Sequence, residues 1–155
     1  MTLSFREARP EDKADLIALW QACGLTRPWN DPAHDIDLAL ATQSATLLLG
    51  EAAEGIVASV MLGFDGHRGW VYYLAVDPAR RRQGHARSLM AAAEAWFRAR
   101  SVPKINLMVR DDNGDALGFY RALGYETQAV TTLGKRLDGQ DPGLGARQQM
   151  KGSKA

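Results

Sequence analysis

Hydrophobic and polar positions in the first part of the chain predict one strand followed by two helices. The strand covers 3–8, where Leu3 and Phe5 alternate with polar residues. A proline at position 10 followed by acids suits a helix N-terminus, and a glycine at position 24 suits its end. The apolar stripe of this helix contains Leu16, Ile17, Trp20 and Cys23. A second helix is predicted over 33–42, with Asp31 as its N-cap.

The middle of the chain predicts three strands and a long helix. Two strands, over 45–52 and 56–64, are separated by a short stretch typical of a hairpin connection. The run over 70–76 is dominated by β-branched and aromatic residues and predicts a buried central strand. A helix then extends from the loop at 80–84 to about residue 100. Its predicted core face comprises Ala86, Leu89, Met90, Ala93 and Phe97.

The last part predicts a strand at 104–109, a helix at 113–123, and two further strands at 124–127 and 130–137. The order β-α-α-β-β-β-α-β-α-β-β over 1–137 indicates an α+β fold, a single domain in which helices flank a mixed, twisted central sheet. Almost no residue from 138 to 155 is apolar, so this segment is predicted to be a flexible, disordered C-terminal tail.

Length, charge and cysteine content narrow the functional classes. The chain has 155 residues, which fits one domain. Its 19 Lys+Arg against 18 Asp+Glu give no basic field that would favour nucleic acid or a membrane surface as a partner. Charges begin too early for a signal peptide, and no apolar run approaches the ~20 residues that cross a bilayer. The single cysteine, Cys23, excludes an internal disulfide and a thiolate metal cluster. We expect a cytoplasmic monomer or homodimer with no metal.

The strongest chemical signal is a basic, glycine-containing loop between the strand at 70–76 and the long helix. A helix that opens from such a loop presents free N–H groups and the positive end of its dipole to an anion. Gly84 and Ala86 are small, so a phosphate can approach the backbone closely. Arg80, Arg81 and Arg82 add positive charge, and a diphosphate is the ligand that suits the loop best. The alternative is a solvated basic loop that only caps the helix.

Two motifs in order along the chain resemble those of the GNAT superfamily of acetyltransferases. Arg81-x-x-Gly84-x-Ala86 is similar to the family's coenzyme A loop. Asn113-x-x-Ala116-x-x-x-Tyr120, followed by Gly124-Tyr125, is similar to its second motif. The segment Leu74-Ala75-Val76-Asp77-Pro78 also looks like the family's Leu-x-Val-x-Pro strand end. The resemblance implies a GNAT fold over 3–137, acetyl-CoA as cosubstrate, and transfer of the acetyl group to a primary amine by direct attack in a ternary complex. The loops at 27–32 and 63–69 resemble those of the bacterial YpeA-like branch.

The same resemblance assigns the coenzyme-binding residues. It implies a V-shaped opening between the fourth and fifth strands, where main-chain groups pair with the pantetheine arm. The loop's N–H groups would hold the pyrophosphate, and Asn113 would hydrogen-bond the arm. The implied set is Leu74, Ala75, Val76, Arg81, Arg82, Gln83, Gly84, His85, Ala86, Arg87, Asn113 and Tyr120.

Tyr120 is the candidate catalytic residue. When an amine attacks a thioester, the leaving group is a thiolate, which benefits from a nearby proton donor. A phenol is neutral at pH 7 and can donate, and the resemblance places Tyr120 near the thioester sulfur. The alternative is a core aromatic that closes a helix-to-strand corner.

The acceptor side is less defined. No acid lies within the run 70–76, so Asp65 and His67 in the preceding turn are the nearest titratable candidates for a general base, although His67 equally fits an exposed turn histidine. Tyr72 and Tyr73 are predicted to face opposite sides of their strand, one lining the acceptor side and one packing under a helix. A polar-aromatic cluster in the loop after the first helix is either an acceptor wall or a rigid corner. Its members are Arg27, Trp29, Asn30 and Asp31.

Two functions from different classes follow. The first is an acyl-CoA-dependent N-acetyltransferase whose amine acceptor is a small molecule or a protein. The alternative is a catalytically weak CoA-binding sensor or interaction module of the same fold. Tyr120 and the intact loop favour the enzyme, whereas the absence of an acid on the strand at 70–76 is compatible with the sensor.

Overall fold

A computed structural model describes residues 2–139 of the chain. These residues fall into two compact units, the first formed by 2–27 and 31–108 and the second by 28–30 and 109–139. The predicted C-terminal tail, from residue 140 onward, lies outside the described residues. No helix among the described residues is both long enough and apolar enough to cross a membrane.

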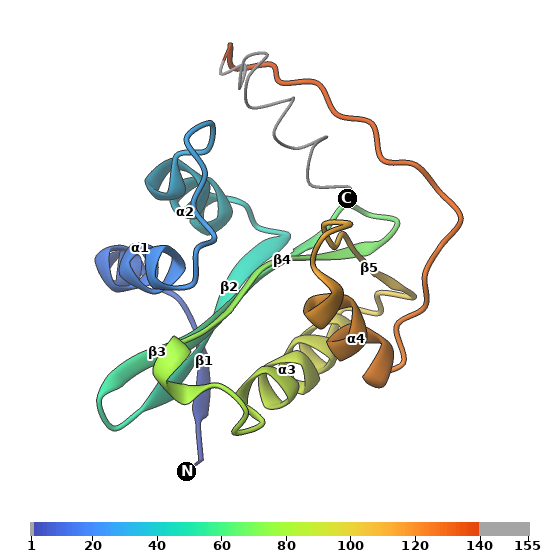
Figure 1. Ribbon diagram of the computed structural model, residues 1–155. Helices are drawn as coiled ribbons and strands as arrows, with labels where there is room; N and C mark the ends of the chain where they lie inside the picture. Colours follow the sequence, from blue (N-terminus) through green and yellow to red (C-terminus); the bar gives the residue numbers. More distant parts are fainter. Residues whose placement is uncertain (1, 140–155) are drawn as a thin grey trace. The chain divides into compact units, whose positions relative to one another are not determined.

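A five-stranded sheet forms the centre of the first unit (Figure 1). Its strands are β1 (Ser4–Glu7), β2 (Ala45–Ala52), β3 (Gly55–Phe64), β4 (Gly69–Val76) and β5 (Ile105–Leu107). They lie in sequence order across the sheet; the first four are antiparallel and β5 runs parallel to β4. The predicted α+β class with a mixed sheet is confirmed.

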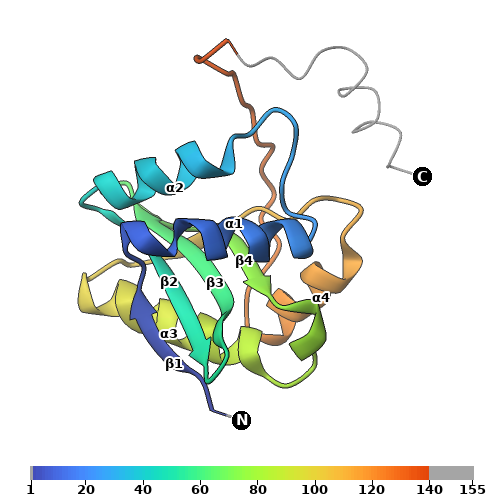
Figure 2. The ribbon, with the colours of Figure 1, turned by 90° about the vertical axis from the view of Figure 1, so that its left-hand side faces the viewer.

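Helices cover both faces of this sheet (Figures 1 and 2). On one face lie α1 (Lys13–Ala22), which follows a short 3-10 turn η1 (Pro10–Asp12), and α2 (Pro32–Ala41). On the other lies α3 (His85–Ala99), after the 3-10 turn η2 (Pro78–Arg80). Asp31 caps α2 as predicted, since its carboxylate accepts from the N–H groups of Ala33 and His34. The core between α1, α2 and the sheet comprises Leu16, Leu19, Trp20, Ile36, Ala39, Leu47, Leu49 and Ala75.

The pairing of β3 with β4 is interrupted by a β-bulge. Ser59 pairs with Ala75, and Met61 pairs with Tyr72, so β4 spans one residue more than β3 over the same stretch. Tyr73 takes up the extra length in a left-handed conformation, with φ at 53°. Cross-strand partners share a face, so the bulge brings Tyr72 and Ala75, three positions apart, to the same side of the sheet.

The second unit contains α4 (Gly114–Ala122), capped by Asn113, whose side-chain oxygen accepts from Ala116 N at 3.1 Å. The two strands predicted at 124–127 and 130–137 are wrong, because no strand lies in the described part of this unit, up to residue 139. The apolar residues of the segment, Val130, Leu133 and Leu137, are 80%, 92% and 91% exposed. β-propensity favours a strand only where side chains pack against a sheet face, and these do not.

Candidate functional site

The loop between β4 and α3 has the geometry of an anion site. Gly84 occupies the N-cap position of α3 in a left-handed conformation, with φ at 81°, and Arg82 is also left-handed, with φ at 62°. No side chain among the described residues caps this helix. The first N–H groups of a helix have no carbonyl partner within it, so those of α3 remain available to a bound anion, and the helix dipole favours negative charge there.

The side chains of this loop differ in their exposure and in their partners. Arg81, Arg82, Gln83 and Arg87 are exposed around Gly84. Arg80 instead forms an ion pair with Glu54, from the β2–β3 connection, and so anchors the loop to the sheet. His85 points inward: it is 4% exposed, and its Nε2 atom has no hydrogen-bond partner among the described residues.

The strand that precedes the loop has a partly unpaired edge. β4 pairs with β5 only where 69–71 meets Ile105–Leu107, so within the described residues 72–76 are paired with β3 alone. At the end of this segment, Cys23 donates from Sγ to the Val76 carbonyl at 3.2 Å. Burial raises the pKa of the Cys23 thiol, which keeps it protonated for this hydrogen bond. Leu74, Ala75 and Val76 thus lie on a strand edge that an extended ligand could extend.

The two tyrosines of β4 lie on the same face of the sheet, so the prediction of opposite faces is wrong. Tyr72 pairs with Met61, which packs against the α1–α2 core, and its ring lies 6.5 Å from that of Trp70. Tyr73 packs on the same core, with its ring 4.0 Å from the Trp20 ring and 2° from parallel. The bulge at Tyr73 breaks the two-residue alternation on which the prediction depended.

A carboxylate from α2 reaches the Tyr73 hydroxyl. The phenol donates to Asp35 Oδ2 at 2.6 Å, and both side chains are half-buried. Burial raises the pKa of Tyr73 well above its usual range, the hydrogen bond to Asp35 adds to this, and the charge of Arg27 acts in the opposite direction. Sequence reasoning missed Asp35, because it lies 38 residues from Tyr73 and in no recognisable motif.

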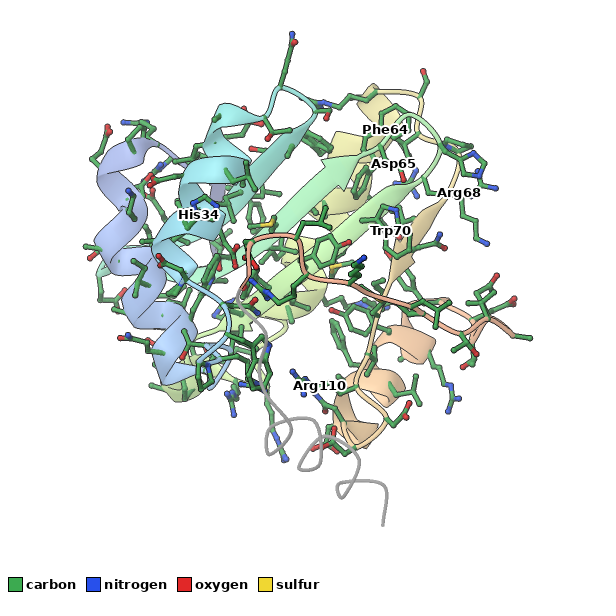
Figure 3. The ribbon with its side chains drawn as sticks, turned by 90° about the horizontal axis from the view of Figure 1, so that it is seen from above. His34, Phe64, Asp65, Arg68, Trp70 and Arg110 are labelled. Atoms are coloured by element: carbon green, nitrogen blue, oxygen red, sulfur yellow. The ribbon has the colours of Figure 1, made fainter. Side chains whose placement is uncertain are left out.

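The turn between β3 and β4 engages the acid that was predicted as a possible base. Asp65 Oδ1 accepts from the N–H groups of His67 at 2.8 Å and Arg68 at 2.7 Å, and Oδ2 accepts from Trp70 Nε1 at 3.2 Å. These backbone hydrogen bonds lower the pKa of Asp65. The His67 side chain is exposed. Figure 3 shows Asp65 and Trp70 together at this turn, with His34 apart on α2. Asp65 therefore closes a turn.

The loop after α1 has the features of a rigid corner. In the first unit, the Arg27 guanidinium donates to the carbonyls of Gly24 at 2.8 Å and Thr26 at 2.9 Å, and Asp31 is occupied as the cap of α2. In the second unit, Asn30 Oδ1 accepts from Arg136 Nη1 at 2.9 Å, and Trp29 is half-buried.

The second unit gives Tyr120 an aromatic surrounding. Its ring makes edge contacts with Phe119, at 5.1 Å between centroids, and with Tyr125, at 5.7 Å. Burial raises the pKa of Tyr120 to about 12, so its hydroxyl is protonated at neutral pH. Asn113 uses its oxygen as the cap of α4, which leaves its amide nitrogen as a donor.

Comparison with known proteins identifies a family and similar relatives. The model of the Acetyltransferase (GNAT) family matches residues 13–125. An acetyltransferase of Yersinia enterocolitica is 45% identical over 135 residues, covering 87% of this chain and 96% of the relative.

Solved structures show the same fold. AAC(6')-Iy, in complex with the bisubstrate analog CoA-S-monomethyl-acetylneamine, superposes with a TM-score of 0.75 at 16% identity, covering 88% of this chain and 99% of that one. A predicted acetyltransferase of Clostridium acetobutylicum, solved with acetyl-CoA, gives a TM-score of 0.71 at 16% identity, covering 88% and 98%.

Proposed function

Because the chain belongs to the Acetyltransferase (GNAT) family, we propose that it moves the acetyl group of acetyl-CoA to a primary amine by direct attack in a ternary complex. Acetyl transfer follows from the family. The acceptor class, a primary amine, and direct attack in a ternary complex are proposed in addition. The observation that carries it is the uncapped start of α3 behind Gly84, a site for a diphosphate at the end of an unpaired strand edge.

We assign the coenzyme to this continuous stretch of the first unit. The pyrophosphate binds the N–H groups at the start of α3, with Arg81, Arg82 and Arg87 supplying positive charge. Gln83, His85 and Ala86 contribute through their main chain. The pantetheine arm pairs with the main chain of Leu74, Ala75 and Val76. Asn113 donates to the arm from its side-chain amide. The solved complex of the Clostridium acetobutylicum protein with acetyl-CoA supports coenzyme A as the ligand of this fold.

The chemistry of the step defines the role of Tyr120. The amine nitrogen attacks the thioester carbonyl, the C–N bond forms, and the C–S bond breaks with its electron pair on sulfur. The thiolate then takes the Tyr120 hydroxyl proton, which burial keeps on the phenol at neutral pH. We therefore propose Tyr120 as the general acid of the reaction.

The acceptor is a primary amine on a small molecule or a protein. The bisubstrate analog bound by AAC(6')-Iy joins coenzyme A to an acetylated amine, which supports this acceptor class and direct attack. The β3–β4 turn and the loop after α1 carry the sequence resemblance to the YpeA-like branch, and we propose that the chain belongs to it.

A thiol-release assay over an amine panel tests the function. The panel contains small mono- and diamines, aminoglycosides, peptides with free N-termini and lysine peptides. We expect thiol release that requires both acetyl-CoA and one class of amine, with the acetylated product identified by mass spectrometry. If calorimetry shows acetyl-CoA binding but no amine supports release, the chain is the CoA-binding module instead.

A further inference from the structure

Direct attack by an amine requires a group that takes the nitrogen's proton. A primary amine such as that of lysine has a pKa of about 10.4, so it is protonated at neutral pH and must lose a proton to react. β4 carries no acid. Asp65 is held by three N–H donors in the turn before it, with its pKa lowered. The other candidate of this turn, His67, is exposed to solvent, so a carboxylate for this role has to come from an element packed against β4.

We propose that Asp35 is this proton acceptor and that it acts through the hydroxyl of Tyr73. The inference rests on the proposed function. Its basis is the 2.6 Å hydrogen bond from the Tyr73 hydroxyl to Asp35 Oδ2, which joins a carboxylate on α2 to the strand assigned to the pantetheine arm. Because the phenol donates to Asp35, its oxygen lone pairs are free to accept a hydrogen bond from the acceptor's nitrogen.

The pair is held in a fixed orientation. The Tyr73 ring lies parallel to the Trp20 ring at 4.0 Å, and Trp20 is fully buried. The indole N–H of Trp20 donates to Ser59 Oγ at 3.0 Å, which fixes the plane against which Tyr73 rests. A catalytic group held by packing needs little rearrangement when the substrate binds.

Tyr73 places the pair beside the segment of β4 that is assigned to the pantetheine arm. Tyr73 is the left-handed residue of the bulge, directly before Leu74, and it lies in the segment 72–76 that β5 leaves unpaired. The bulge turns its side chain toward α1 and α2. A regular strand would have placed Tyr73 on the α3 face, away from Asp35.

The proton moves in two coupled transfers. Before the nitrogen attacks, one N–H bond of the ammonium breaks: the electron pair stays on nitrogen as the lone pair that attacks, and the proton goes to the Tyr73 oxygen. The phenol's own proton goes to Asp35 Oδ2, so Tyr73 ends neutral and Asp35 becomes a carboxylic acid. Asp35 later releases this proton to water. Tyr120 supplies the separate proton that the thiolate takes. Once the C–N bond has formed, the nitrogen loses its second proton to solvent, and solvent returns a proton to the Tyr120 oxygen.

The charges around the pair favour proton transfer from the Tyr73 hydroxyl to Asp35. Arg27, from the segment after α1, is the cation that acts on Tyr73, and it opposes the effect of Asp35 on the phenol's pKa. The Trp20 ring of α1, which contacts Tyr73, is uncharged, and so is Ser59 of β3, which accepts from Trp20. On α2 itself, His34 is exposed and Asp37 is paired with Lys13.

The test compares four variants: Asp35→Asn, Tyr73→Phe, the double variant, and Asp37→Asn as a matched control that removes a neighbouring carboxylate of α2. With the amine identified by the panel, each single variant should lower kcat by about 10²–10³-fold, within the range for loss of a general base. The double variant should lose no more than the worse single one, because both residues act in one chain. In all four variants, the acetyl-CoA affinity and the thermal midpoint should stay near wild type. In Asp37→Asn, kcat should also stay near wild type.

The pH profile separates proton transfer from a structural role. As the pH rises, more of the amine is already deprotonated, so the deficit in kcat of Asp35→Asn relative to wild type should shrink. An Asp35→Asn enzyme with wild-type kcat and profile would overturn the relay while leaving the acetyltransferase intact. So would a rise in KM alone, which would mean that Asp35 only binds the ammonium, or a joint fall in stability and acetyl-CoA affinity. A wild-type protein inactive on every amine would instead remove the proposed function, and the relay with it.

Discussion

A methyl group on Gly69 would lie 2.6 Å from Cε1 of Phe97, closer than two carbon atoms can approach. Gly69 begins β4, and Phe97 lies near the end of α3, where its ring is 1% exposed. The missing side chain lets the ring lie directly against the first residue of the strand. This contact sets how closely the C-terminal part of α3 packs on the sheet.

Gly69→Ala should therefore destabilise the fold. Phe97 is a buried ring of the core, so the expected loss is about 1–3 kcal/mol in the free energy of unfolding, as for an overpacked core. Urea denaturation measures it. Gly63→Ala is the matched control, because a side chain there meets nothing within 4 Å. Equal stability of the two variants would contradict the close packing of Gly69 on Phe97.

Asp12 should make stability depend on pH in the acid range. Arg6 holds its carboxylate by two hydrogen bonds of 2.8 Å, and Arg9 N donates to it at 2.7 Å. The Arg6 hydrogen bonds lower the pKa of Asp12 to about 2, from an ordinary value of 3.8. A lowered folded-state pKa gives stability that is complete above about pH 5 and is lost as the pH falls through the ordinary value of 3.8 to about 2.

Asp12→Asn should remove most of that dependence. We expect on the order of 2 kcal/mol less stability at neutral pH and a flatter curve of unfolding free energy between pH 4 and 2. Urea titrations at a series of pH values measure both. Glu11→Gln, at the exposed neighbouring residue, should change the neutral-pH stability by less than about 0.5 kcal/mol. If the unfolding free energy of Asp12→Asn still falls between pH 4 and 2 as it does in wild type, the pH dependence of stability comes from other groups.

The elements with strong local signals could be predicted from the sequence. The N-cap of α2 at Asp31 and the end of α1 before Gly24 follow from side-chain and backbone preferences that act within a few residues. The amphipathic face of α3 was predicted in the same way: Leu89, Met90, Ala93 and Phe97 are buried, whereas Ala86, predicted on the same face, is half-buried. The loop that ends at Gly84 also follows from the sequence, since a left-handed position there calls for glycine.

The features that depend on distant pairing could not be predicted. Nothing local marks Tyr73 as a left-handed residue, because the bulge arises from its register with β3. Without the bulge, alternation placed Tyr72 and Tyr73 on opposite faces, and Asp35 had no evident partner. The strand predicted at 130–137 was wrong because a strand also needs a distant pairing partner. Its residues suit a strand, but no sheet edge among the described residues pairs with them.

Replacement of Gly84 tests the coenzyme assignment with a built-in control. Gly84→Ala and Gly84→Glu both place a side chain at φ 81°, so both carry the same backbone cost, and neither Cβ meets an atom within 4 Å. Only glutamate adds a negative charge at the start of α3. Acetyl-CoA affinity, measured by calorimetry, should fall at least tenfold more in Gly84→Glu than in Gly84→Ala. Equal affinities in two folded variants would remove the pyrophosphate from this loop.

Tyr120→Phe tests the proposed general acid. Phenylalanine keeps the ring and its edge contacts with Phe119 and Tyr125 but removes the hydroxyl proton. We expect kcat to fall by about 10²–10⁴-fold with acetyl-CoA affinity near wild type, because the thiolate then leaves without a donor. Tyr125→Phe is the matched control, which removes a hydroxyl from the neighbouring ring and should keep kcat within a few fold. An acceptor whose amine is identified by the panel is needed, and single-turnover measurements ensure that chemistry limits the rate. If Tyr120→Phe keeps full kcat under those conditions, Tyr120 is a packing residue; if stability and affinity fall together, its hydroxyl supports the fold instead of the leaving thiolate.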